Sequence, residues 1–283
     1  MHSHVFYCPT TLNLGGKIAS IKLPIVMGVI NVNHDSFYVG SALQDKDMIL
    51  KRVAEMLESD VAIIDLGAVS TRPGAKAISE QEEIKRLSFG LETIRNHYPE
   101  IPISIDTYNI NVLKAVSHFT IQMVNDVSGG NEAIYEWVAE NRLPYILMHM
   151  KGTPETMRSL ANYDDIMKEM LDYFIHRIER LQKAGVKDII LDPGFGFAKT
   201  IDQNYYLLNH LQVFHMLELP ILVGLSRKSM IWKTLDVTAE EALNGTTALH
   251  MIALNKGVHI LRAHDVKEAK QTIQLYHTIQ TNI

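Results

Sequence analysis

The chain has 283 residues, of which 47% are hydrophobic and 21% charged, and its formal net charge at pH 7 is −5. These proportions are ordinary for a soluble globular protein, and the slight negative charge gives no reason to expect nucleic acid as a partner. No apolar stretch approaches the ~20 residues of a membrane span, and the N-terminus lacks the basic start and long apolar core of a signal peptide. Cys8 is the single cysteine, which suits a reducing compartment. We therefore expect one soluble, cytoplasmic domain.

Eight short apolar runs follow one another along the chain, and a segment with helical spacing of apolar residues comes after each run. Continuous apolar runs of this kind predict strands buried on both faces, as in a parallel sheet. Eight such strands alternating with helices are what a (β/α)₈ TIM barrel requires. We therefore predict an α/β fold with one TIM-barrel domain over residues 25–283, on which an N-terminal extension, residues 1–24, packs. The predicted strands are 25–30, 61–66, 103–105, 121–124, 145–148, 189–191, 221–225 and 260–261.

The helices between these strands have recognisable ends. Ser79 opens a capping-box pattern at the second helix, which we expect to end before Pro99. Gly185 and Gly257 stand where a left-handed glycine would end two later helices. The predicted helices are 46–57, 79–98, 109–116, 132–141, 163–184, 203–217, 239–255 and 266–278.

A polar residue or a glycine-rich turn follows each predicted strand. Because TIM barrels place their chemistry at the C-terminal ends of their strands, we expect these side chains to converge on one rim and to form the active site. A single Asp after a strand is more often a turn former or helix cap than a catalyst, so we assign Asp126 to its turn, and Asp65 is open to the same interpretation. The polar residues are Asn31, Asp65, Asp106, Asn125, Asp126, His149, Asp192, Ser226, Arg227, Lys228, Arg262 and His264.

The cationic members of this set favour an anion. Lys228, Arg262 and His264 follow the last two strands, where barrels frequently hold a phosphate. Residues 226–229 also open a helix, whose exposed N–H groups favour negative charge. Asn31 either contributes its amide or ligates a divalent ion such as Mg²⁺, which usually binds a few protein oxygens together with substrate phosphates. These residues predict a phosphorylated substrate.

Asp106, Asn125 and Asp192 differ in kind from the cationic set. Carboxylates only accept hydrogen bonds, whereas an amide both donates and accepts. Two carboxylates and an amide therefore suit a planar heterocycle that carries both donors and acceptors. A ring on one side of the rim and a phosphate on the other predict a heterocycle with a phosphorylated arm.

Two predicted connections, residues 31–45 and 67–78, are too long to be simple turns, and barrel loops of this length usually form part of the active site. The first contains Asp35, and the second contains Thr71, Arg72 and Pro73. We expect a mobile loop that carries hydroxyls and an arginine to close over an anionic substrate. The alternative is a solvated loop whose Ser and Thr residues cap its own turns.

Histidines raise a competing interpretation, a zinc site. His34, His149 and His264 all belong to segments that we place near the rim. None of them lies in a His-Glu-x-x-His or His-x-His pattern, which such sites commonly show. We therefore favour the phosphate and heterocycle interpretation over a His-ligated metal.

At these residues the chain resembles the dihydropteroate synthase family of the folate pathway, from about residue 25 to the C-terminus. Several ordered motifs carry the resemblance, each at a strand end or in one of the two long loops. They are residues 27–32, 35–37, 70–75, 104–107, 125–130, 148–152, 192–197, 226–229 and 262–266. The resemblance implies a transferase that joins 6-hydroxymethyl-7,8-dihydropterin diphosphate to 4-aminobenzoate, giving 7,8-dihydropteroate and diphosphate. It also implies a homodimer that uses Mg²⁺, acts on small molecules and is a target of sulfonamides.

The same resemblance implies a role for each matched residue. Diphosphate would leave first, and the arylamine would attack the resulting pterin cation, with Asp35, Lys228 and Arg262 as catalytic residues. The implied pterin-binding residues are Asp106, Asn125, Asp192, Lys228 and Arg262. The implied diphosphate-binding residues are Asn31, Thr71, Arg262 and His264, with Asn31 also a ligand of Mg²⁺. The implied aminobenzoate-binding residues are Phe197, Ser229, Thr71 and Pro73.

The two long loops depart from the family pattern. Asn33 and His34 stand where a Thr-Pro pair is usual, and Val69 stands where glutamate is common. Loss of the proline should loosen the first loop, so loop closure and turnover rate are the properties affected. Two rivals remain: a pterin-dependent methyltransferase barrel, which has no diphosphate to bind, and a non-catalytic pterin-binding homologue. Turnover with 4-aminobenzoate separates all three.

Overall fold

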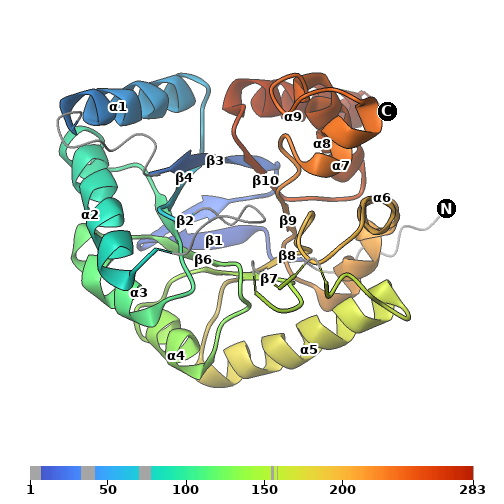
Figure 1. Ribbon diagram of the computed structural model, residues 1–283, viewed down its shortest axis with the longest axis horizontal. Helices are drawn as coiled ribbons and strands as arrows, with labels where there is room; N and C mark the ends of the chain where they lie inside the picture. The colour runs from blue at the N-terminus through green and yellow to red at the C-terminus, as the bar shows by residue number, and fades with distance from the viewer. Residues whose placement is uncertain (1–7, 33–41, 70–77, 154–155, 158, 283) are drawn as a thin grey trace.

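The computed structural model describes residues 8–32, 42–69, 78–153, 156–157 and 159–282. Eight parallel strands form one sheet in the order β8-β7-β6-β5-β4-β3-β10-β9, and a parallel bridge between Leu191 and Ile221 joins its two edges. Helices surround this ring of strands (Figure 1), so the predicted (β/α)₈ TIM barrel is confirmed. Its strands are β3 Ile25–Asn31, β4 Ile63–Gly67, β5 Ile103–Asp106, β6 Met123–Asp126, β7 Tyr145–Met148, β8 Ile189–Asp192, β9 Leu222–Val223 and β10 Ile260–Ala263.

The helices largely follow the predicted pattern. Ser79 is the N-cap of the second helix and accepts from Glu82 N, and Gly185 ends the fifth helix with φ 98°. The segment predicted as one helix over 203–217 is instead an α-helix and a 3₁₀ helix that meet at His210. Among the described helices, none is long and apolar enough to cross a bilayer. They are α1 Ala42–Glu58, α2 Glu80–His97, α3 Ile110–Val116, α4 Glu132–Glu140, α5 Ile166–Ala184, α6 Ile201–Asn209, α7 Ser229–Leu235, α8 Leu243–Asn255 and α9 Val266–Thr281, with the 3₁₀ helices η2 Ser117–Phe119 and η3 Leu211–Leu217.

An antiparallel hairpin, β1 Thr11–Leu14 and β2 Lys17–Ser20, precedes the barrel. Leu12, Leu14 and Ile21 are buried against apolar residues from the N-terminal halves of the barrel strands, such as Met27 and Ile63. Each such side chain contributes roughly 1.5–3 kcal/mol by leaving water. The hairpin therefore covers the N-terminal end of the barrel and leaves the opposite end for the site. The division of the chain at residue 24 stays a prediction.

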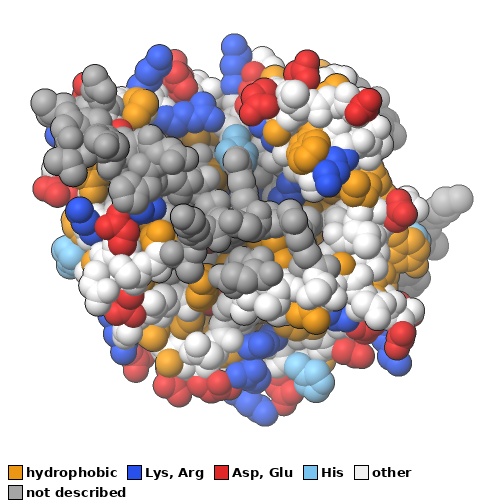
Figure 2. Space-filling model, in the orientation of Figure 1, with side chains coloured by type: hydrophobic (Ala, Val, Ile, Leu, Met, Phe, Trp, Pro, Cys, Tyr) orange, Lys and Arg blue, Asp and Glu red, His pale blue; other side chains and the backbone are white. Residues whose placement is uncertain are grey.

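The surface carries charges of both signs. Figure 2 shows acidic and basic side chains interspersed around the periphery of the face in view, with hydrophobic side chains between them. Apolar atoms make up more than half of the surface of most folded proteins. The informative features of this molecule are therefore its buried polar side chains.

Candidate active site

Polar side chains from neighbouring strands form a row at the C-terminal rim. The register pairs Asn31 with Gly67, Gly67 with Asp106, and Asp106 with Asn125. A Cβ atom at Gly67 would lie 3.2 Å from Asn31 Oδ1 and 3.3 Å from Asp106 Cβ. Asp106 and Asn125 are buried, whereas Asn31 is exposed. The row thus runs from solvent at Asn31 into the barrel mouth at Asn125.

Arg262, on β10, joins this row through two carboxylates. Its Nε donates to Asp65 Oδ2 at 2.6 Å, and its Nη2 donates to Asp106 Oδ2 at 2.8 Å. Asn125 Nδ2 donates to the same Asp65 oxygen at 3.0 Å. Asp65 is therefore neither a turn former nor a helix cap, since its fully buried carboxylate binds both Arg262 and Asn125. We call these four residues the Arg262 cluster.

The Arg262 cluster contains two carboxylates and one guanidinium, and their charges influence one another. Burial raises the pKa of Asp106 to about 7, against the opposing charge of Arg262, and the like charge of Asp65 adds to the rise. Burial acts against the charged form of Arg262, but Asp65 and Asp106 outweigh it and raise the pKa of Arg262 above its usual value. Arg262 therefore stays a cation, while Asp106 can gain or lose a proton near neutral pH.

Asp192 and Lys228 form the opposite side of the mouth. Asp192 ends β8, and its Oδ1 accepts from Gly194 N at 2.8 Å. Burial raises the pKa of Asp192, and the charge of Lys228 is the largest opposing influence. Burial likewise lowers the pKa of Lys228 to about 8, against the charge of Asp192. A Cβ atom at Gly224 would lie 3.8 Å from Lys228 Nζ and 4.0 Å from Arg262 Cδ. Lys228 and Arg262 therefore lie close together.

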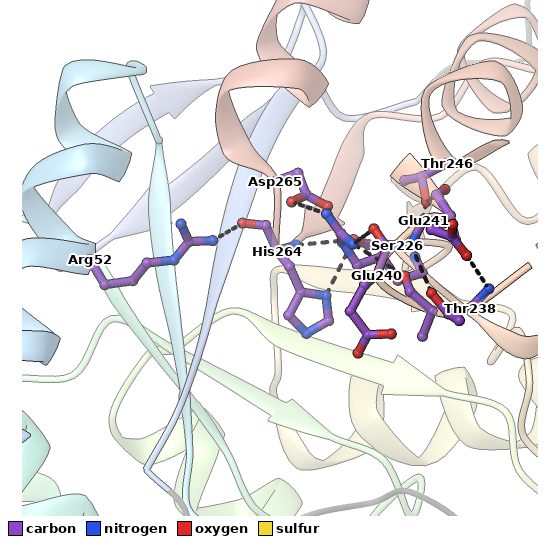
Figure 3. Close-up of polar contacts among 11 residues, drawn as sticks. Arg52, Ser226, Thr238, Glu240, Glu241, Thr246, His264 and Asp265 are labelled. Carbon is purple, nitrogen blue, oxygen red and sulfur yellow. Dashed lines mark hydrogen bonds and ion pairs between the residues drawn. The ribbon is translucent and has the colours of Figure 1, made fainter. Parts of the chain in front are cut away.

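His264 follows β10 and is held by residues on both sides (Figure 3). Its backbone N–H donates to Ser226 Oγ at 3.2 Å, and its ring Nδ1 lies 3.2 Å from the same oxygen. Arg52 Nη2 donates to the His264 carbonyl. Because Ser226 Oγ accepts from the backbone, its own proton is available to Nδ1, which favours the tautomer with a proton on Nε2. In that tautomer Nε2 is a hydrogen-bond donor suited to an anion.

Arg227 is a cation that we also predicted at the rim. In the structure its guanidinium binds other protein groups, so we do not assign it to a ligand. Its guanidinium binds Asp265 through two bonds, Nε to Oδ2 at 2.8 Å and Nη2 to Oδ1 at 3.0 Å. Its Nη1 donates to the carbonyl of Ala239 at 3.1 Å. Arg227 thus fixes the segment after β9 against the segment after β10, which carries His264.

Lys199 is a buried residue near the site that no sequence pattern singled out. Its Nζ lies 3.0 Å from the carbonyls of Gly194 and Phe197 and 3.1 Å from His149 Nδ1. Burial, which Lys228 and Lys151 reinforce and Asp192 opposes, lowers the pKa of Lys199 to about 7. Burial and the charge of Lys199 lower the pKa of His149 well below 6.5, so that its Nδ1 serves as an acceptor.

The remaining predicted site residues divide into described and undescribed ones. Lys228 Nζ lies 4.7 Å from the ring centroid of Phe197, and Ser229 is the first residue of α7. Three predicted residues, Asp35, Thr71 and Pro73, lie outside the described residues. The structure therefore brings together the predicted side chains at the strand ends. It does not describe the three predicted residues on the two long loops.

The structure tests the turn assignment of Asp126, whereas the zinc interpretation includes His34, which lies outside the described residues. Asp126 Oδ1 accepts from Ser128 N at 2.7 Å and from Ser128 Oγ at 2.6 Å, so its assignment to the turn is confirmed. Among the residues that the structure describes, no group of three His, Cys, Asp or Glu side chains could hold a metal ion. A magnesium ion at this rim would depend on substrate oxygens together with Asn31, which is the kind of site that Mg²⁺ prefers.

Comparison with known proteins gives a consistent result. Residues 27–264 match the family described as pterin binding enzyme. The chain is 40% identical to the dihydropteroate synthase of Escherichia coli strain K12 over 263 residues, which cover 92% of this chain and 93% of that protein. The crystal structure of the Yersinia pestis dihydropteroate synthase with a sulfonamide drug superposes with a TM-score of 0.89, at 37% identity over 96% of this chain and 99% of that chain. The Xanthomonas albilineans enzyme with 4-aminobenzoic acid gives 0.87, at 32% identity over 96% and 98% of the two chains. The chain belongs to the dihydropteroate synthase family of pterin-binding enzymes.

Proposed function

We propose that this chain is a dihydropteroate synthase, a transferase that joins 6-hydroxymethyl-7,8-dihydropterin diphosphate to 4-aminobenzoate in folate biosynthesis. The products are 7,8-dihydropteroate and diphosphate. The Arg262 cluster is the observation that carries the proposal, because a partly buried arginine between two carboxylates lies at a mouth that also holds Asp192. Such a site suits a neutral, hydrogen-bonding heterocycle with an anionic arm.

We assign the pterin to Asp106, Asn125 and Asp192. The two carboxylates accept hydrogen bonds from pterin N–H groups, and the Asn125 amide supplies a donor and an acceptor. Lys228 lies near the pterin carbonyl, and the planar guanidinium of Arg262 stacks on the ring. The burial of all three polar residues supports this assignment, since a polar site excluded from water discriminates strongly against a ring that fails to pair with it.

We assign the diphosphate to Asn31, Thr71, Arg262 and His264. Support comes from the contacts of His264 with Ser226, which favour a donor at Nε2, and from the fixed charge of Arg262. Bound Mg²⁺ would neutralise charge on the diphosphate oxygens, with Asn31 as its protein ligand. Calorimetry with inorganic diphosphate, with and without Mg²⁺, tests the assignment.

The mechanism that these residues support is dissociative substitution. The C–O bond to diphosphate breaks first, and both of its electrons leave with the diphosphate. Arg262 and His264 stabilise the negative charge that develops on the leaving group. Asp35 stabilises the pterin cation, and Lys228 orients the ring. The arylamine nitrogen then forms the new C–N bond and loses a proton.

We place 4-aminobenzoate beside Phe197 and Ser229, with Thr71 and Pro73 of the second long loop closing over it. The 4.7 Å separation of Lys228 Nζ from the Phe197 ring supports this placement, because the same lysine lies at the pterin side. A sulfonamide is expected to compete with 4-aminobenzoate, as the drug complex of the Yersinia pestis relative suggests.

Release of diphosphate on mixing both substrates with magnesium tests the proposed function. Dihydropteroate synthase releases one diphosphate for each dihydropteroate formed. A pterin-dependent methyltransferase binds the pterin but releases no diphosphate, and a non-catalytic homologue binds without product. Pterin binding without diphosphate release would therefore refute the proposal.

We further propose a cytoplasmic homodimer. Leu275 and Ile279 lie one turn apart on α9, and they are 62% and 53% exposed. Exposed apolar side chains on one helix face are suited to an interface between copies. Sedimentation of the intact chain, compared with a Leu275→Glu variant, tests the assembly.

A further inference from the structure

The turn after β8 has an unusual backbone. Gly194, Gly196 and Ala198 all have positive φ, at 68°, 81° and 47°. A Cβ atom at Gly194 would lie 2.1 Å from the His149 carbonyl oxygen, so this position requires glycine. Phe197 belongs to this turn, which we call the 194–198 turn. The conformation is costly for Ala198, so contacts from elsewhere must hold it.

Side chains from several segments supply such contacts. Tyr163 Oη donates to the Ala198 carbonyl at 2.9 Å, and Lys228 Nζ donates to the Phe195 carbonyl. Asn204 Oδ1, on α6, accepts from Gly196 N at 2.7 Å. Lys199 Nζ donates to the carbonyls of Gly194 and Phe197, and its third neighbour is His149 Nδ1. An ammonium has three protons and lacks acceptors of its own. All three donors of Lys199 therefore have a partner within 3.1 Å.

Lys199 is buried, so its ammonium depends on these hydrogen bonds. Only 9% of Lys199 is exposed, and a buried ammonium is costly unless it is fully hydrogen-bonded. His149 is 2% exposed, and its ring packs against Tyr173 at 4.8 Å between centroids. Lys199 thus contacts a buried histidine on one side and two carbonyls of the 194–198 turn, those of Gly194 and Phe197, on the other.

We infer that Lys199 is a positioning residue for 4-aminobenzoate, because its ammonium fixes the turn that carries Phe197. The identity of this substrate rests on the proposed function. Gly194 N also donates to Asp192 Oδ1 at 2.8 Å, and this bond to the pterin-side carboxylate does not involve Lys199. Loss of the ammonium therefore affects the arylamine side of the site more than the pterin side.

The test replaces Lys199 with methionine, which has a similar length but no donors. Lys199→Met should raise the KM for 4-aminobenzoate by roughly tenfold. Without the ammonium the 194–198 turn is no longer held in place, and Phe197 positions the substrate less well. The Kd for a pterin analogue should stay unchanged. Lys183→Met is the control for the loss of a lysine ammonium, because Lys183 is largely exposed and pairs with Glu179 of its own helix, α5. Its KM should equal that of the parent.

Amide hydrogen exchange supplies a readout that does not depend on catalysis. Lys199→Met should speed exchange within residues 194–198, whereas Lys183→Met should not. If the methionine variant does not fold, Lys199→Gln, which keeps two N–H donors on a shorter side chain, is measured by the same criteria.

The outcomes separate the inference from the proposed function. A parent protein that releases no diphosphate refutes the proposed function, while exchange still reports on Lys199. An active parent with an unchanged KM in the variant overturns the inference alone. A lower kcat at constant KM, with unchanged exchange in the turn, would also overturn it, because it would indicate a merely structural role.

Discussion

Asp65→Asn is the sharpest test of the Arg262 cluster. Asparagine has nearly the same shape as aspartate, so the substitution opens no cavity. It removes one negative charge from a fully buried carboxylate whose Oδ2 accepts from Arg262 Nε and Asn125 Nδ2. We expect two effects, a loss of stability and a change in the titration of Asp106.

The magnitude of the stability loss follows from the contacts that remain. Breaking a buried ion pair completely costs about 3–5 kcal/mol. Arg262 keeps its second carboxylate, Asp106 at 2.8 Å, so the loss should approach that of one charge-assisted hydrogen bond, about 1.5–3 kcal/mol. Urea denaturation at neutral pH measures it.

The effect on pH dependence has a definite sign. The like charge of Asp65 raises the pKa of Asp106, which is about 7 in the parent protein. Without that charge the pKa of Asp106 falls, so the carboxylate stays ionised to lower pH. If an ionised Asp106 binds the pterin, affinity in the parent falls as the pH drops through about 7. In the variant the same fall should occur at a lower pH, as calorimetry with a pterin analogue would show.

Asp126→Asn is the matched control, because Asp126 is also fully buried but accepts from Ser128. It should lose stability with a smaller change in the pH midpoint of pterin binding, since Asp126 has a weaker influence on Asp106 than Asp65 has. An Asp65→Asn variant with the stability and pH midpoint of the parent would refute the reasoning.

Three further predictions concern single residues. Asp192→Asn should weaken binding of a pterin analogue about tenfold to a hundredfold, because a charge-assisted bond is worth roughly 1.5–3 kcal/mol; calorimetry that finds equal affinity would remove Asp192 from the site. Arg262→Lys should lower kcat/KM by at least about tenfold, since lysine keeps the charge but loses the fork that reaches two carboxylates; steady-state rates equal to the parent's would contradict this role. Burial lowers the pKa of His250 to about 4. As the pH falls below 6.5, His250 therefore takes up a proton in the unfolded chain before it does so in the folded protein. The free energy of unfolding should drop by up to about 3 kcal/mol between pH 6.5 and 4. His250→Leu should lose less stability over this range in chemical denaturation, and an equal loss in both proteins would show that other groups cause it.

The barrel and much of its rim could be predicted because a strand buried on both faces leaves an unbroken apolar run. Asp106, Asn125 and Asp192 stand at the ends of such runs, so chain order alone places them at one end of the barrel. Strand lengths were harder to predict. The run over 221–225 becomes the two-residue β9, because Leu225 accepts from Lys228 N in a turn and apolar composition does not distinguish a turn from a strand.

Contacts between distant residues were beyond prediction from one sequence. Asp65 and Arg262 are 197 positions apart, and no local pattern joins them. Lys199 and His149 are 50 positions apart and likewise meet only in the folded chain. The β1–β2 hairpin is different, since Gly15 and Gly16 lie between two short runs, the first of which alternates polar and apolar residues, and this is a recognisable two-residue turn. That signal was present in the sequence, where only a packed extension was predicted.

The difference between Asp65 and Asp106 indicates how the site reconciles stability with binding. A partly buried arginine needs a counterion whether or not substrate is bound, and Asp65, which is inaccessible to solvent, can serve in both states. Asp106 is 8% exposed and lies at the mouth, where a ligand can share its carboxylate. The charge of Asp65 raises the pKa of Asp106 and the charge of Arg262 lowers it, so Arg262 must remain beside Asp106 to favour its ionised form. We therefore expect Asp65 to act as the permanent counterion of Arg262 and Asp106 as the exchangeable one, which makes Asp65 essential to the site without contact with substrate.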